Sequence, residues 1–294
     1  MDVLTRLFGT PTAFRRWAVA SLVANMVLVV TGAIVRLTGS GLGCPTWPTC
    51  KDDAYVPEAA LGIHGLIEFG NRLLTFVLII IAVATLVAAF RSGADRTSKG
   101  LAFLTAAGIP LQGVIGGITV LTQLNPYVVA LHLLLSIALI VLLTRLVMRT
   151  RGYVTTAVEP RLVWLARATF AVMMIAIWVG TVVTGSGPHS GDGGARRTGL
   201  DIETVAKLHS ASVWASIALT IACIILFGRA GHRRARRLAM GVLHASLLQG
   251  AIGYAQYFLG LPLGLVIAHM VGLAIVTVAV SALCFGVART ERLA

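Results

Sequence analysis

Charged side chains are scarce in this sequence. Asp, Glu, Lys and Arg make up only 12% of the residues, whereas ordinary soluble domains carry about 25%. Hydrophobic residues make up 57% of the chain, and the mean hydropathy is +0.89. This balance excludes an ordinary soluble globular protein and indicates an integral membrane protein.

The first apolar segment lacks the small-residue cleavage site of a secretory signal peptide, and further apolar segments follow it. We therefore expect it to stay in place as a membrane anchor. Runs of about 20 apolar residues, the length that crosses a bilayer, recur along the chain and predict an all-α, polytopic membrane protein. The eight expected transmembrane helices are Arg16–Thr38, Ile63–Phe90, Leu101–Leu121, Tyr127–Met148, Leu162–Thr184, Thr204–Phe227, Leu238–Phe258 and Gly264–Ala288.

A net charge of +13 could suggest a nucleic-acid partner, but the positions of the charges argue against one. Basic residues gather before the first span and after every second span, whereas most acids lie in the opposite loops. This is the positive-inside pattern, which predicts that both termini are cytoplasmic. The basic residues are Arg6, Arg15, Arg16, Arg91, Arg96, Lys99, Arg149, Arg151, Arg161, Arg229, Arg233, Arg234, Arg236, Arg237, Arg289 and Arg292, and the acids are Asp52, Asp53, Glu58, Asp192 and Asp201.

Cysteine is also rare, with four in the chain. Cys44 and Cys50 lie in "GLGCPTWPTC", a loop expected on the outer side, where a disulfide can persist. The Pro and Gly residues there can turn the chain so that the sulfurs meet; two free thiols are the alternative. A zinc site is disfavoured because no second pair with suitable spacing exists. Cys223 and Cys284 fall inside spans, where we interpret them as apolar filler.

The sequence contains an internal repeat. "LQGVIGGITVLTQLNPYVVALHL" from Leu111 aligns without a gap with "LQGAIGYAQYFLGLPLGLVIAHM" from Leu248, and "TGSG" occurs at 38–41 and at 184–187. The repeat predicts two four-helix bundles, residues 1–150 and 151–294, related by an axis along the membrane normal because each has an even number of spans. The alignment pairs Gln112 with Gln249, Gly116 with Gly253, and His132 with His269.

Three histidines lie at similar depth near the outer ends of spans: His132, His209 and His269. Ionisable groups within a membrane are costly and usually functional, and neutral imidazole is a good iron ligand. Two histidines from facing helices of a bundle can hold a haem between them, so His209 and His269 are a candidate pair. The alternative is that each histidine only hydrogen-bonds a neighbouring helix.

The first half has Asn71 where the second half has His209. His64, Glu68, Asn71 and Arg72 can share one helix face. A haem in this half would be held by His132, with its other side open, weakly held by Asn71 or reached by His64. Such a haem beside a carboxylate has the character of a substrate. Glu68 is a candidate acid/base or forms a structural ion pair with Arg72, and Arg72 could instead bind a haem propionate.

The repeat, the cysteine loop around "WP", Glu68 and the three matched histidines together resemble the haem A synthase family over essentially the whole chain. The family converts haem O to haem A for cytochrome oxidases by oxidising a ring methyl to a formyl group. The resemblance implies a bacterial plasma-membrane enzyme with the cysteine loop extracytoplasmic. It also implies a possible haem O-making farnesyltransferase partner and an unidentified electron partner.

Carried over by position, the resemblance implies that His209 and His269 ligate a resident haem b. His132 would ligate haem O in the first half, Glu68 would act in catalysis, and Cys44 and Cys50 would form a disulfide. "EFGNR" departs from the family's Glu-x-x-His-Arg, which puts bis-histidine ligation of the first haem in doubt. The rival functions are a non-catalytic di-haem electron carrier, which should have two complete histidine pairs near opposite faces, and a transporter.

Overall fold

The computed structural model describes residues 3–51, 54–57, 61–153 and 155–289, and these parts contain nine helices and two short strands. Eight of the helices are long and apolar enough to cross a membrane. In chain order the elements are α1 Val3–Phe8, α2 Pro11–Leu37, α3 Gly62–Arg91, α4 Arg96–Leu121, α5 Pro126–Thr150, β1 Thr156–Val158, α6 Pro160–Ser186, α7 Ile202–Arg229, α8 Arg233–Phe258, α9 Leu263–Phe285 and β2 Val287–Arg289.

The prediction of eight apolar helices is confirmed, and two details of it are corrected. The last helix was expected to reach Ala288 but ends at Phe285, after which β2 pairs in parallel with β1. The short amphipathic helix α1 precedes the first span and was not expected. Four of the charges used to predict the topology, Asp52, Asp53, Glu58 and Arg292, lie outside the described residues.

Short polar and proline signals set where several spans begin. Thr10 precedes Pro11 and accepts a hydrogen bond from the Ala13 N–H at 3.1 Å. Asn125 plays the same part before Pro126, and Asp95 caps α4 through the N–H groups of Thr97 and Ser98. These side chains pair amide groups that the first helical turn leaves unsatisfied, while proline lacks such a group and is tolerated there.

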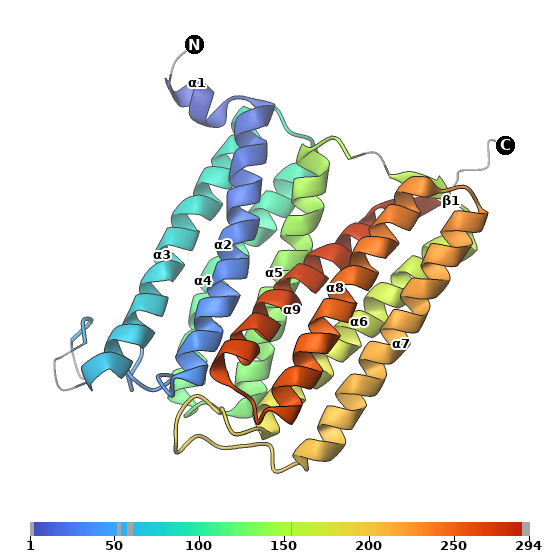
Figure 1. Cartoon of the computed structure of the whole chain (residues 1–294). Coiled ribbons are helices and arrows are strands. Elements are labelled where there is room, and N and C mark those ends of the chain that lie inside the picture. Colours follow the sequence, from blue (N-terminus) through green and yellow to red (C-terminus); the bar gives the residue numbers. More distant parts are fainter. Residues whose placement is uncertain (1–2, 52–53, 58–60, 154, 290–294) are drawn as a thin grey trace. The chain divides into compact units, whose positions relative to one another are not determined.

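The chain forms two compact units (Figure 1). Unit 1 comprises the residues up to Arg151 together with Thr181–Ile202. Within it, α2 packs against α3 and α5, and α4 packs against the same two helices, so α3 and α5 are diagonal partners in a four-helix bundle. Its apolar core includes Leu78, Ala82, Ile109 and Leu139.

Unit 2 comprises Gly152–Gly180 and the residues from Glu203 onward, and contains most of α6 with α7, α8 and α9. Helix α8 packs along α9. Polar contacts join α7 to its neighbours: Cys223 lies 3.5 Å from the Thr169 hydroxyl on α6, and Trp214 donates to the Tyr254 hydroxyl on α8 at 3.0 Å. Unit 2 is therefore also a helical bundle, with α7 beside both α6 and α8.

Candidate functional site

The loop between α2 and α3 is closed by a disulfide. Cys44 and Cys50 are bonded, with their Cα atoms 4.4 Å apart, and both are completely buried. The predicted disulfide is confirmed. The two cysteines are six residues apart in sequence, so the bridge closes a short loop. This loop restricts where the intervening Trp47 can lie.

Glu68 connects α3 to this loop. Its Oε2 accepts the Cys44 backbone N–H at 2.6 Å, and its Oε1 accepts the Arg72 guanidinium at 2.6 Å. Glu68 is only 5% exposed. The ion pair between Glu68 and Arg72, one helical turn apart, is thus present. The interpretation of Glu68 as a structural ion-pair partner requires this contact. A buried carboxylate with two charge-assisted or short hydrogen bonds is firmly oriented.

Arg72 on α3 also binds this loop. Its guanidinium donates to the carbonyl oxygens of Cys44, Thr46 and Thr49, each at 3.0 Å. A planar guanidinium has five N–H donors in a rigid fork. In Arg72 the Nη1 and Nη2 groups donate to backbone carbonyl oxygens of this one loop. Arg72 and Glu68 therefore make one connected hydrogen-bonding system with the disulfide loop.

The loop reaches the helix that faces His132. A Cβ atom added at Gly117 of α4 would collide with the indole of Trp47, so this glycine is what lets the indole lie against the helix. A Cβ at the preceding residue, Gly116, would lie 3.3 Å from Cε1 of His132. Trp47 and the His132 ring therefore contact neighbouring positions of α4, which places the disulfide loop beside the histidine.

His209 on α7 and His269 on α9 meet inside unit 2. Their ring centroids are 6.5 Å apart and the ring planes make an angle of 75°. Metal–imidazole bonds are about 2 Å long, so two histidines on opposite sides of one metal ion should have centroids about 6 Å apart. The Nδ1 atom of His209 is 2.9 Å from the Ala176 carbonyl oxygen, the usual partner that leaves Nε2 for a metal. This geometry fits a haem with two histidine ligands.

A set of contacts around His269 is repeated around His132. The side-chain amide of Gln249 donates to the His269 carbonyl oxygen at 2.7 Å, and that of Gln112 donates to the His132 carbonyl oxygen at 3.2 Å. Gly253 makes room for the His269 ring as Gly116 does for His132. The importance of these glutamines and glycines was not predicted, although the repeat alignment had already paired them.

The Nδ1 atoms of His132 and His269 are both buried without a hydrogen-bond partner among the described residues. Leaving a buried polar nitrogen unpaired costs about 1–3 kcal/mol, so the same orphan at both repeat positions needs a reason. A bound group that contacts Nδ1 itself would supply one. The described residues contain no group of three or more His, Cys, Asp or Glu side chains that could hold a bare metal ion.

The other two residues predicted near the first haem lie apart from each other along α3. Asn71 contacts α2, where its Oδ1 accepts the Thr31 hydroxyl at 2.8 Å. His64 is exposed, and its Nδ1 lies 2.9 Å from the Ser40 hydroxyl in the loop that follows α2. His64 thus contacts the loop after α2, and Asn71 is half-buried against α2.

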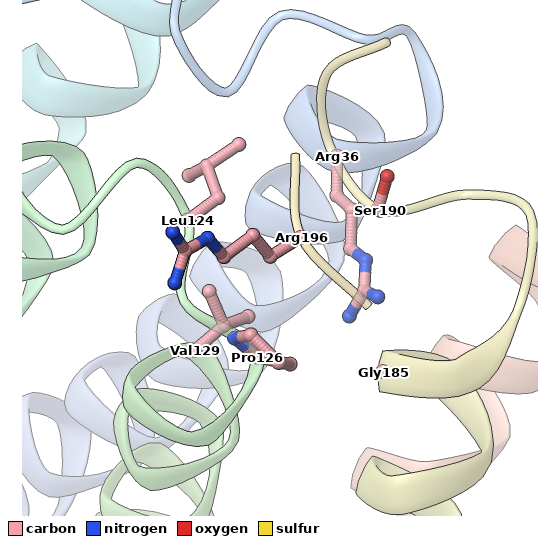
Figure 2. A pocket seen from close by; sticks show the side chains of 7 residues that line it. All are labelled: Arg36, Leu124, Pro126, Val129, Gly185, Ser190 and Arg196. Carbon is pink, nitrogen blue, oxygen red and sulfur yellow. The ribbon is translucent and has the colours of Figure 1, made fainter. Parts of the chain in front are cut away.

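A small crevice lies within unit 1 (Figure 2). Its unfilled volume is about 180 Å³ including open solvent. Arg36 borders it and donates to the carbonyl oxygens of Thr184 and His189, each at 2.6 Å. It is lined by Arg36, Leu124, Pro126, Val129, Gly185, Ser190 and Arg196. We interpret Arg36 as the anchor of the segment after α6.

Comparison with known proteins identifies the family. The family model COX15-CtaA, described as cytochrome oxidase assembly protein, matches residues 15–62 and 61–189, together more than half of the chain. The chain belongs to this family. The matched ranges contain the disulfide loop, Glu68 and His132, whereas His209 and His269 lie beyond them. The interpretation of unit 2 as a haem site therefore depends on the geometry of the His209 and His269 rings and on the internal repeat.

Several curated relatives carry the name heme A synthase. The relative from Bacillus pumilus is 32% identical over 154 residues, which are 50% of this chain and 49% of the relative. That from Lysinibacillus sphaericus is 35% identical over 140 residues, 46% and 45% of the two chains. This chain thus spans about half the length of these two relatives. The relative from Bacillus licheniformis is 24% identical over 276 residues, 87% of this chain and 90% of the relative.

Proposed function

We propose that this protein is a haem A synthase, which oxidises a ring methyl of haem O to a formyl group to supply haem A to cytochrome oxidase. The main support is the unequal pair of sites. Unit 2 has two histidines at the separation that one metal ion requires, while unit 1 repeats the environment of only one of them. One site is suited to a permanent haem b and the other to a guest haem.

The reaction needs two successive two-electron oxidations of the methyl group, through a hydroxymethyl and a hydrated aldehyde that loses water. In each step one oxygen atom would enter from water, while two electrons and two protons leave. A haem held by His209 and His269 would supply one-electron redox chemistry, and an external electron acceptor would take up these electrons. His132 would hold haem O in unit 1, with its farnesyl tail among the apolar spans.

The residues of the chain contribute proton transfer and exclusion of water. Glu68 is buried and held by Cys44 and Arg72, so it can accept and return the protons released as the methyl group is oxidised. The disulfide loop with Trp47 would cover the outer side of the haem O site. Arg72, which already donates to this loop through Nη1 and Nη2, would use its remaining N–H groups for a propionate.

The same proposal sets the protein in a bacterial plasma membrane with both termini in the cytoplasm and the disulfide loop outside. A haem O-making farnesyltransferase would deliver the substrate. This orientation is supported by the charge bias of the loops and by the presence of a disulfide, which persists in oxidising compartments.

The test is to express the protein in a bacterial host that makes haem O but no haem A, and to extract and separate the haems. We expect haem A to appear in membranes that contain the protein and not in membranes with an empty vector. The host must also supply an electron partner, which an unmodified haem A synthase from a relative can verify in parallel. Haem O alone, beside a positive result for that relative, would contradict the proposal.

A further inference from the structure

Asn71 occupies the place in unit 1 that His209 occupies in unit 2. His209 contacts the Ala176 carbonyl oxygen on α6, and Asn71 contacts Thr31 on α2. Aligning the two "TGSG" segments puts Ala176 opposite Val30, the neighbour of Thr31. Both side chains therefore reach the same part of the first helix of their unit, and the two positions are equivalent in the fold and not only in the sequence.

A second residue differs together with Asn71. In unit 2, a Cβ atom at Gly180 would lie 3.1 Å from Cε1 of His209, so the imidazole occupies space that the glycine leaves open. The same alignment puts Ile34 of α2 opposite Gly180. By this alignment a branched side chain stands where unit 2 has a glycine, and we infer that it takes up the room that an imidazole at position 71 would need. Unit 1 thus has neither the second histidine nor the matching glycine.

The amide of Asn71 is oriented by Thr31. The Thr31 hydroxyl has a single hydrogen, and Oδ1 of Asn71 at 2.8 Å is a nearer acceptor for it than the Leu28 carbonyl oxygen at 3.1 Å. With Oδ1 so engaged, the Asn71 NH₂ group is turned away from Thr31, and it donates to no acceptor among the described residues. A carboxamide in this state is a hydrogen-bond donor, and is a poor ligand for iron compared with imidazole.

His64 does not replace the missing ligand in this arrangement. Its ring is bonded to Ser40 in the outer loop, and the side chain is exposed. It also lies seven residues before Asn71, which is about 10 Å along the helix axis. Bringing it over the position next to Asn71 would require breaking the loop contact and moving the ring past Glu68.

We propose that the haem of unit 1 is held by His132 alone, and that Asn71 and Ile34 keep its second axial position open to a small exogenous ligand, to which the Asn71 amide donates a hydrogen bond. This inference rests on the proposed function insofar as it assumes a haem in unit 1. It assigns Asn71 and Ile34 to ligand access, and Thr31 is a positioning residue for the amide.

Ligand binding tests this directly, without measuring product. Protein purified from a host that makes haem O is reduced and exposed to carbon monoxide, or oxidised and titrated with cyanide. We expect about one of the two haems in each chain to bind carbon monoxide, because a haem with two histidine ligands has no free position. Wild-type protein that holds two haems and binds neither probe would overturn the inference.

Two reciprocal variants show which haem responds. The double variant Asn71→His with Ile34→Gly reproduces the arrangement of unit 2, and we expect it to lose carbon monoxide binding and to become fully low-spin. Asn71→His alone should do this incompletely, because Ile34 still fills the space. His209→Asn should do the opposite and open the second haem to carbon monoxide. A double variant that folds, holds two haems and still binds carbon monoxide in unit 1 would contradict the role of these residues.

A separate variant tests the hydrogen bond from the Asn71 amide to the exogenous ligand. Asn71→Leu keeps the approximate shape of the side chain and removes the donor, so we expect cyanide binding roughly tenfold weaker and a higher stretching frequency for bound carbon monoxide. Thr31→Val should produce a smaller change in the same direction. Unchanged cyanide affinity and frequency in Asn71→Leu would remove the donor role even if the position is open.

Failure of this inference and failure of the proposed function give different results. If His132→Ala left the number of bound haems unchanged, unit 1 would hold no haem through His132 and the assumption taken from the proposed function would fail. If two haems are bound and haem A is formed, but wild-type protein ignores both probes, the function stands and the open position is wrong.

Discussion

The Glu68→Gln variant is expected to keep its haem and its disulfide loop but to form haem A at least 100-fold more slowly than wild type. Glutamine retains an oxygen that can accept the Cys44 N–H, and Arg72 keeps its three bonds to loop carbonyls. What the variant loses is a group that can take up and release a proton, a contribution of about 10²–10⁴-fold in general acid–base catalysis. Haem extraction and chromatography measure the product, and the absorption spectrum measures bound haem.

Glu203→Gln is the matched control. Glu203 also pairs with a cation four residues later, with Lys207 at 2.6 Å, but it is 60% exposed on its side chain. Exposed pairs contribute little, so this variant should behave as wild type. Haem A formation at the wild-type rate by Glu68→Gln would restrict Glu68 to anchoring the loop.

Loss of product could also follow from a displaced loop, and the disulfide provides the check. Cys44 and Cys50 are completely buried beneath the contacts of Glu68 and Arg72. If the loop stays in place in Glu68→Gln, mild reductant should open the disulfide no faster than in wild type. Faster reduction would show that the carboxylate is needed to hold the loop, and proton transfer would then have to be tested by Glu68→Asp.

The apolar spans could be predicted closely because lipid imposes one simple condition on them. Backbone groups in a bilayer must be paired within the segment, so an uninterrupted apolar run becomes a helix. The predicted ends at Leu121 and Phe258 coincide with those of α4 and α8. The end of α9 was missed because Val287–Arg289 leaves the helix to pair with Thr156–Val158, and two three-residue strands far apart in sequence carry no periodic signal.

The site could be predicted only where its contacts are local. The pair of Glu68 and Arg72 follows from their spacing of one helical turn. The bond from the Cys44 N–H to Glu68 does not, because it depends on how a loop folds back over a helix that begins after it. The contact between Thr31 and Asn71 likewise depends on the rotation of two packed helices, which an alignment of repeats does not contain.

The function of two glycines could not be predicted from the sequence, although the repeat alignment had paired them. Gly116 and Gly253 were paired by the repeat, but a glycine in an apolar helix has many uses. Only their position against the His132 and His269 rings shows that they provide room for an imidazole. The third such glycine, Gly180, has no counterpart in unit 1, and that difference carries the inference about Ile34.

Removing one of the two histidines that we propose as haem ligands in unit 2 should have the largest effect on bound haem. In His269→Gly, the resident haem should lose its low-spin spectrum and bind more than tenfold more weakly, since even residues that only support a ligand change metal affinity 10–100-fold. The truncation leaves a space beside Gly253 of about the size of the lost ring. Added imidazole should therefore enter this space and restore the low-spin spectrum, which a globally unfolded protein would not allow. The absorption spectrum with and without imidazole measures both effects.

His244→Gly is the control for the backbone cost of a glycine in a helix, about 1 kcal/mol. His244 lies on α8 of the same unit and is exposed, so its loss should leave the haem spectrum unchanged. His132→Gly should instead remove the carbon monoxide-binding haem and spare the low-spin one, because the two sites are in different units. If His269→Gly retained a full low-spin haem without imidazole, the 6.5 Å separation of the His209 and His269 rings would be mere aromatic packing, and the division of the chain into a permanent and a guest site would lose its basis.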